Sequence, residues 1–192
     1  MTVYGWLILA LWLVLVVYWV VAARAAKRNI GSRWLWWREI AIRLGIFALL
    51  MLTVRMAVVR RALPDEYLYA LSTSMLMGLL GFVICVLGVG LAIMARAYLG
   101  RNWGMPMSRK ENPELVTNGP YALVRHPIYG GLLLAMLGSA LGQSVLWLLP
   151  MIVYGPYFIL SARREESLLT EQFAERYRVY MSRTKLLVPF VL

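Results

Sequence analysis

The chain alternates long apolar stretches with short polar connections, which is the pattern of a helical membrane protein. Residues 3–23 form about 21 mostly apolar positions, or roughly 30 Å of helix, enough to cross the hydrocarbon core of a bilayer. Residues 40–59 form a second stretch, in which Arg43 and Arg55 lie near the ends and can extend toward the interface. Residues 71–95 form a third stretch without a charge. These stretches predict three N-terminal membrane-spanning helices.

The fourth apolar stretch, residues 128–161, is too long for a single span. Its roughly 34 uncharged residues would make a straight helix of about 50 Å, whereas the hydrocarbon core is about 30 Å thick. Residues that favour a turn lie near its middle: Gly138, Gly142, Gln143 and Ser144. The stretch therefore predicts a hairpin of two helices over residues 128–141 and 145–161, for a total of about five spans.

Residues 162–192 are more polar and differ in pattern. Apolar and aromatic residues recur at helical spacing among charged ones, namely Leu168, Leu169, Phe173, Tyr177 and Tyr180. This pattern predicts an amphipathic C-terminal helix that continues the fifth span onto the membrane surface. The predicted fold is an all-α integral membrane protein. Three transmembrane helices occupy residues 1–95, and a polar loop, the helical hairpin and the C-terminal helix occupy residues 96–192 of the same integrated domain.

Composition supports the membrane class and limits the partners. The 192 residues are 61% hydrophobic with a mean hydropathy of +0.69, and the net charge is +11. Basic residues cluster in alternate connections, so the positive-inside rule predicts an outside N-terminus and a cytoplasmic C-terminus. We therefore expect the basic residues to meet anionic headgroups, as in a bacterial inner membrane, and not nucleic acid. One histidine and one cysteine argue against a structural zinc site, and no metal site is predicted.

Polar residues gather in three segments that the hairpin brings to the cytoplasmic face: residues 101–121, "RHPIY" at 125–129 and "RREE" at 163–166. The only histidine, His126, precedes a proline suited to the first turn of a helix, where free backbone N–H groups can hold a polar ligand. Taken alone, His126 also fits a capping residue, and the arginines fit headgroup anchors. Glu165 and Glu166 are adjacent, so at most one is expected to face inward.

The most specific motifs are "NW" at 102–103, "ELVTNGPYALVRHPIYGG" at 114–131, "EESLLTEQFAERYRVYM" at 165–181 and the late Pro189. Together they resemble the isoprenylcysteine carboxyl methyltransferase family, within a wider group that includes membrane phospholipid N-methyltransferases. The resemblance covers about residues 100–190. It implies a site for S-adenosyl-L-methionine enclosed by the last two spans, the loop before them and the C-terminal helix, so that this loop is a cofactor-binding loop.

Carried over by position, the resemblance implies the following cofactor-binding residues: Pro113, Glu114, Leu115, Val116, Tyr121, His126, Pro127, Ile128, Tyr129 and Glu165. In the family an arginine shortly before this glutamate contacts the substrate. Here the aligned position is Ser161, while arginines follow at 163 and 164. The candidate catalytic residues are Arg163, Arg164 and Glu166.

The predicted function is S-adenosyl-L-methionine-dependent methyl transfer to a lipid or lipid-linked acceptor at the cytoplasmic membrane face. A prenylcysteine-like carboxylate needs mainly alignment and exclusion of water. A lipid amine must also lose a proton, with Glu166 or His126 as the candidate base. Two alternatives remain open. One is an NADPH-dependent membrane sterol or lipid reductase, because such reductases carry a similar C-terminal pattern, and the other is a non-enzymatic membrane scaffold.

Overall fold

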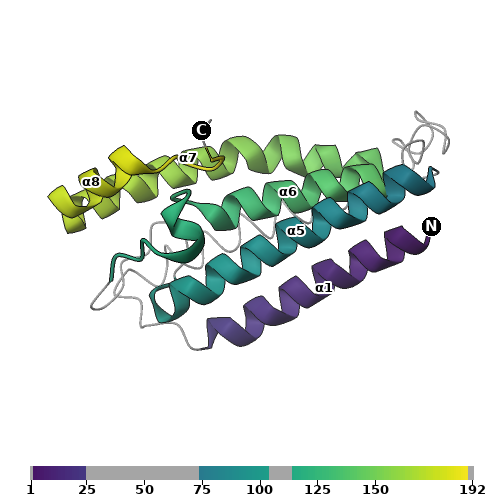
Figure 1. Cartoon of the computed structure of the whole chain (residues 1–192), viewed down its shortest axis with the longest axis horizontal. Helices are drawn as coiled ribbons and strands as arrows, with labels where there is room; N and C mark the ends of the chain where they lie inside the picture. Colours follow the sequence, from purple (N-terminus) through teal and green to yellow (C-terminus); the bar gives the residue numbers. More distant parts are fainter. Residues whose placement is uncertain (1, 25–73, 104–113, 190–192) are drawn as a thin grey trace.

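In a computed structural model of the protein, residues 2–24, 74–103 and 114–189 are described (Figure 1). The helices in these ranges are α1 (Val3–Ala23), α5 (Met75–Leu99), α6 (Pro127–Gly142), α7 (Leu148–Phe173) and α8 (Glu175–Arg183). Short 3₁₀ turns accompany them: η1 (Gly100–Asn102), η2 (Gly119–Ala122) and η3 (Val145–Trp147). The predicted all-helical fold is confirmed for these residues, and the predicted span over 40–59 lies outside them.

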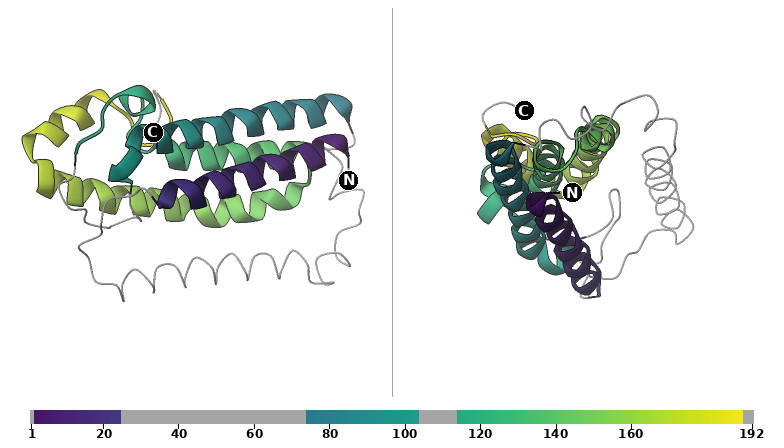
Figure 2. Two further views of the ribbon diagram at one scale, coloured as in Figure 1. Left: turned by 90° about the horizontal axis from the view of Figure 1, so that it is seen from below. Right: turned by 90° about the vertical axis from the view of Figure 1, so that its right-hand side faces the viewer.

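Three of the helical segments are long and apolar enough to cross a membrane: Val3–Ala23, Met75–Asn102 and Val145–Phe173. α6 is also apolar but has 16 residues, or roughly 24 Å of helix. The long helices run along one common axis, and α7 with α8 extends past the end of the others (Figures 1 and 2). These observations support an integral membrane protein, whereas the total of about five spans stays a prediction.

The predicted hairpin consists of α6 and α7, joined by residues 143–147 (Figure 1). α7 does not end at the charged "RREE" segment but continues to Phe173, because arginine, glutamate and leucine all favour helix. This continuation is the predicted amphipathic extension of the hairpin. The helix is interrupted at Ala174, whose φ of 46° is left-handed backbone, and α8 begins directly after it.

α5 and α6 pack closely because small residues line their contact. A Cβ atom on Gly88 would lie 2.4 Å from the backbone nitrogen of Ala135 and 2.6 Å from the carbonyl oxygen of Gly131. Such a position accepts only glycine, which lets the two backbones approach as in small-residue helix pairs of membrane proteins. α1 then packs on α5, with Ile8 and Leu15 in the buried cluster.

The C-terminal segment after α8 folds back beside the start of α6. The backbone N–H of Arg125 donates to the carbonyl of Lys185 at 2.8 Å, and that of His126 donates to Leu186 at 3.0 Å. Leu186 and Leu187 are buried against Ala162 of α7. Residues 124–126 are therefore held between α7 and the C-terminal segment before α6 begins.

A candidate active site at the polar end of the bundle

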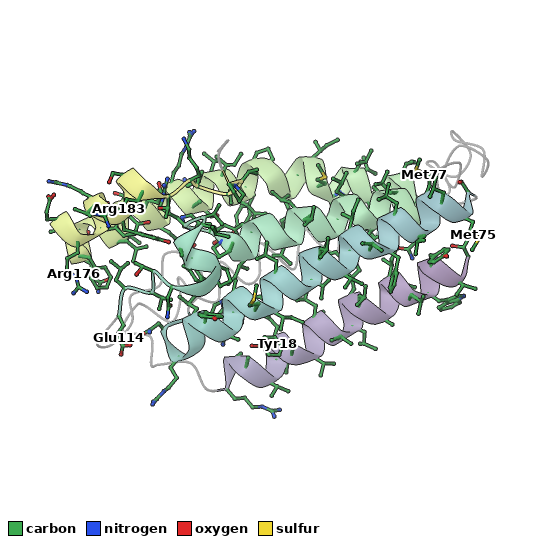
Figure 3. All side chains as sticks on the ribbon, in the orientation of Figure 1. Tyr18, Met75, Met77, Glu114, Arg176 and Arg183 are labelled. Carbon is green, nitrogen blue, oxygen red and sulfur yellow. The ribbon has the colours of Figure 1, made fainter. Side chains whose placement is uncertain are left out.

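Polar side chains gather at one end of the bundle. Glu114, Arg176 and Arg183 lie there, whereas Met75 lies at the opposite end with other apolar side chains (Figure 3). His126 is at this polar end as the residue before α6, and it is 7% exposed. Its position follows from the sequence, because Pro127 lacks an N–H and has the φ of a first helical turn.

Two carboxylates flank the His126 ring. Nδ1 lies 3.5 Å from Oε2 of Glu165, and Nε2 lies 3.7 Å from Oε1 of Glu166. The expectation that at most one of these glutamates faces inward is therefore wrong. Adjacent helical residues point about 100° apart, and the imidazole lies between these two directions, so each carboxylate approaches one ring nitrogen.

Stacked aromatic rings support the histidine. The His126 and Tyr129 rings are parallel within 7° with centroids 5.6 Å apart, and Tyr129 stacks on Phe158 at 4.8 Å. The Tyr129 hydroxyl donates a hydrogen bond to Glu165 at 2.6 Å. The ring orientation of His126 and the carboxylate of Glu165 are thereby held by the same tyrosine, one turn along α6.

Arg125 completes the cluster. Its Nε donates to Glu166, and its guanidinium also donates to the backbone carbonyls of Thr184 and Met181 at the end of α8. The side chains of Arg125 and Glu166 are 11% and 12% exposed, so the ion pair is largely shielded from solvent. Sequence reasoning treated this arginine only as a headgroup anchor, although its place directly before the histidine in "RHPIY" was a usable signal.

The charges around His126 determine its protonation. Burial by itself lowers the pKa of His126, but the negative charges of Glu165 and Glu166 beside its two ring nitrogens outweigh it, so the pKa is raised above its usual value. Burial also raises the pKa of Tyr180 to about 12. Tyr180 therefore stays protonated, and its hydroxyl donates to the Tyr121 carbonyl at 2.6 Å.

A cavity of about 730 Å³ opens beside this cluster. Its lining joins the polar end, including His126 and Glu165, to an apolar part formed by Trp12, Trp19 and neighbours on α1 and by Tyr154 on α7. Pockets of this size commonly hold small molecules and cofactors. The contribution of α1 was not predicted, because its residues are separated from the motifs by most of the chain.

Eight of the ten predicted cofactor-binding residues line this cavity: Glu114, Leu115, Val116, Tyr121, His126, Ile128, Tyr129 and Glu165. Pro127 is buried at the start of α6 without lining the cavity, and Pro113 lies outside the described residues. Among the predicted catalytic residues, Glu166 contacts His126 and Arg125 but does not line the cavity. Arg163 and Arg164 are exposed on α7 and do not line it.

Comparison with known proteins gives the family context. The sequence profile of the family described as phospholipid methyltransferase matches residues 76–176, which include "RHPIY" and both glutamates. This match confirms the resemblance predicted from the motifs. The protein-S-isoprenylcysteine O-methyltransferase of Schizosaccharomyces pombe is 34% identical over 116 residues, covering 58% of this chain and 48% of the relative.

Another relative carries a different name. The nickel-cobalt-cadmium resistance protein NccN of Alcaligenes xylosoxydans xylosoxydans is 31% identical over 107 residues, or 54% of this chain and 50% of that protein. The chain thus spans about half the length of these curated relatives. The solved structure of a eukaryotic intramembrane Ras methyltransferase, isoprenylcysteine carboxyl methyltransferase, aligns with a TM-score of 0.60 at 22% identity, over 77% of this chain and 53% of that chain. This likeness shows a shared fold.

Proposed function

The chain belongs to the phospholipid methyltransferase family, and from this premise we propose that it transfers a methyl group from S-adenosyl-L-methionine to a lipid or lipid-linked acceptor. One observation carries the proposal: a single cavity connects the His126–Glu165 cluster with an apolar wall formed by α1 and α7. A water-soluble cofactor suits the polar part, and a lipid acceptor suits the apolar part. The basic connections favour a cytoplasmic position for the polar end, in an inner membrane.

The residues of the cavity fit the proposed cofactor. Glu165 presents a carboxylate for an amino group, and the aromatic ring of Tyr121 suits a sulfonium cation. Asn102 lines the cavity, and its buried Oδ1 atom has no hydrogen-bond partner among the described residues, so this oxygen can accept from an N–H donor. When bound, the cofactor supplies an electrophilic methyl group on its sulfonium.

The remaining chemistry is positioning and exclusion of water. Tyr129 and Glu166 hold the His126 ring from two sides, which keeps the polar wall of the cavity rigid. A carboxylate acceptor needs no proton transfer. An amine acceptor must give up a proton before it attacks, and Glu165 is the carboxylate of the pair that faces the cavity. His126 is less suited to this role, because its raised pKa favours the protonated ring.

The proposal is tested first by binding. Calorimetry of the purified full chain with S-adenosylhomocysteine should give a measurable heat, and Glu165→Gln should weaken it. The absence of heat and of thermal stabilisation at millimolar ligand would contradict the proposal. Stronger thermal stabilisation by NADPH than by S-adenosylhomocysteine would favour a membrane reductase. If the His126→Ala and Glu165→Ala variants kept every assayable cellular phenotype of the wild type, a non-enzymatic scaffold would be favoured.

The acceptor class is tested by product chemistry. Membranes containing the full chain are incubated with a radiolabelled methyl donor, and the labelled lipids are extracted and treated with mild base. Label released by base indicates a methyl ester, whereas base-stable label indicates a methylated amine. Membranes without the chain set the background, and no label above this background would contradict methyl transfer to a lipid.

A further inference from the structure

Arg96 is an unusual residue of the helix bundle, because it is buried and charged. It lies in the last turn of α5 and is 2% exposed. In the described part of the chain, no carboxylate forms an ion pair with it. A buried charge without compensation is costly, so its contacts should show what stabilises it.

Backbone carbonyls at two helix ends provide that compensation. Nη1 of Arg96 donates to the carbonyl of Gly100 at 2.8 Å, just after α5, and Nη2 donates to the carbonyl of Ala22 at 2.7 Å, at the end of α1. Carbonyls at helix C-termini lack helical partners and carry the negative end of the helix dipole. One guanidinium therefore joins the ends of α1 and α5, although Arg96 and Ala22 are 74 residues apart in sequence.

The same guanidinium orders two tryptophans of the cavity. It lies 4.6 Å from the centre of the Trp103 ring, at a distance suited to a cation–π contact. Trp103 in turn meets Trp19 of α1 edge to face, with ring centroids 6.3 Å apart and an angle of 90°. Trp19 and Trp103 both line the cavity, whereas Arg96 does not.

A second connection leads from Arg96 to the proposed cofactor-binding segment. The carbonyl held by Arg96 belongs to the first residue of η1, and Asn102 ends that turn. Nδ2 of Asn102 donates to Oε2 of Glu114 at 3.5 Å. A displacement of η1 would therefore move the Asn102 side chain, which contacts Glu114 at the start of the segment 114–116.

We propose that Arg96 is a positioning residue, which joins the end of α1 to η1 and thereby fixes both the Trp19–Trp103 wall and Asn102. The inference rests on the proposed methyl transfer, because the cofactor is what this arrangement serves. Lysine has the same charge but is a point donor without the planar fork that reaches two carbonyls and stacks on an indole. Arg96→Lys should therefore retain only part of the effect.

The test compares three variants of the full chain by calorimetry with S-adenosylhomocysteine. Arg96→Gln removes the two charge-assisted hydrogen bonds that hold α1 and η1. Because one such bond contributes about a factor of ten or more, binding should weaken about tenfold or more as the cavity loses its arrangement. Arg96→Lys should fall between Arg96→Gln and the wild type. Arg101→Gln is the matched control, because Arg101 is exposed in η1 and its loss should change binding less than about twofold. Equal affinity of Arg96→Gln and the control would overturn the inference.

A spectroscopic measurement separates this inference from the proposed function. In protein labelled with 5-fluorotryptophan, the ¹⁹F resonances of Trp19 and Trp103 are assigned from their phenylalanine variants. Arg96→Gln should shift both resonances, Arg96→Lys should shift them less, and Arg101→Gln should leave them in place. Unshifted resonances, or a shift confined to Trp103, would overturn the inference. If the wild type bound no S-adenosylhomocysteine, the proposed function would fail. The resonances of Trp19 and Trp103 would still decide whether Arg96 joins the end of α1 to η1.

Discussion

Replacing Glu166 by glutamine removes the carboxylate that joins Arg125 to His126. Both partners of the Arg125–Glu166 pair are nearly buried, with side chains 11% and 12% exposed. Removing one charge of a buried pair typically costs about 3–5 kcal/mol, because the other charge stays without compensation. The glutamine oxygen still accepts a hydrogen bond, which recovers about 1 kcal/mol. Backbone carbonyls of Thr184 and Met181 also remain around Arg125, so we expect a loss of roughly 2–3 kcal/mol in the free energy of unfolding.

The loss is measured by reversible unfolding of the full chain in detergent, followed by circular dichroism. Glu175→Gln provides the matched control, because it makes the same chemical change in an exposed pair. Glu175 and Arg178 lie 3.7 Å apart with side chains 77% and 68% exposed, and such pairs contribute little. We expect no measurable change in the control. Equal stability of the two variants would refute the reasoning that the buried pair holds residues 124–126 against α7 and the C-terminal segment.

Three further predictions concern other parts of the structure. Neighbouring carboxylates raise the pKa of His126, so the protonated ring stabilises the folded state. This stabilisation is complete below about pH 6.5 and is lost as the pH rises through the folded-state pKa. Unfolding of the wild type should show this decline as the pH rises above about 6.5, and His126→Asn should not; a rise in stability above that pH would contradict the assignment. Gly88→Leu should destabilise the chain by at least about 2 kcal/mol in the same assay, because its Cβ meets the α6 backbone at 2.4 Å, whereas Gly90→Ala, with nothing within 4 Å, should not. Replacing Arg163 and Arg164 together by glutamine should leave the calorimetric affinity for S-adenosylhomocysteine unchanged within about twofold, because both are exposed and outside the cavity lining; a larger loss would place them in the site.

The helices could largely be predicted from the sequence, because a membrane span is a local property of length and hydropathy. α1 has the predicted bounds Val3–Ala23, and the uncharged stretch of 34 residues divides into α6 and α7 near the predicted turn. The interruption at Ala174 was not predictable in the same way. A left-handed alanine is locally unfavourable, and its conformation depends on the contacts that α8 makes with residues distant in the chain.

Eight of the residues predicted to bind the cofactor line the cavity, and they could be chosen from the sequence because they belong to two short motifs whose spacing is visible in the chain. The spatial arrangement of the two motifs could not be predicted from the sequence. Glu165 and Glu166 point in different directions from one helix, and only the docking of α6 brings an imidazole between them. Arg125 could not be distinguished from a headgroup anchor until Glu166 and the Thr184 carbonyl were seen beside it.

By itself, therefore, the sequence determined the class of the protein, the apolar helices of the described region and the motifs of its family, because each depends on residues close together in the chain. The tertiary structure decided which charges neutralise one another, which arginines are exposed, and how α1, joined to α5 by the buried Arg96, completes the cavity with Trp19. These features depend on distances between segments far apart in sequence. A buried ion pair and an exposed ion pair can be formed by the same residue types, but their contributions to the free energy of folding differ greatly.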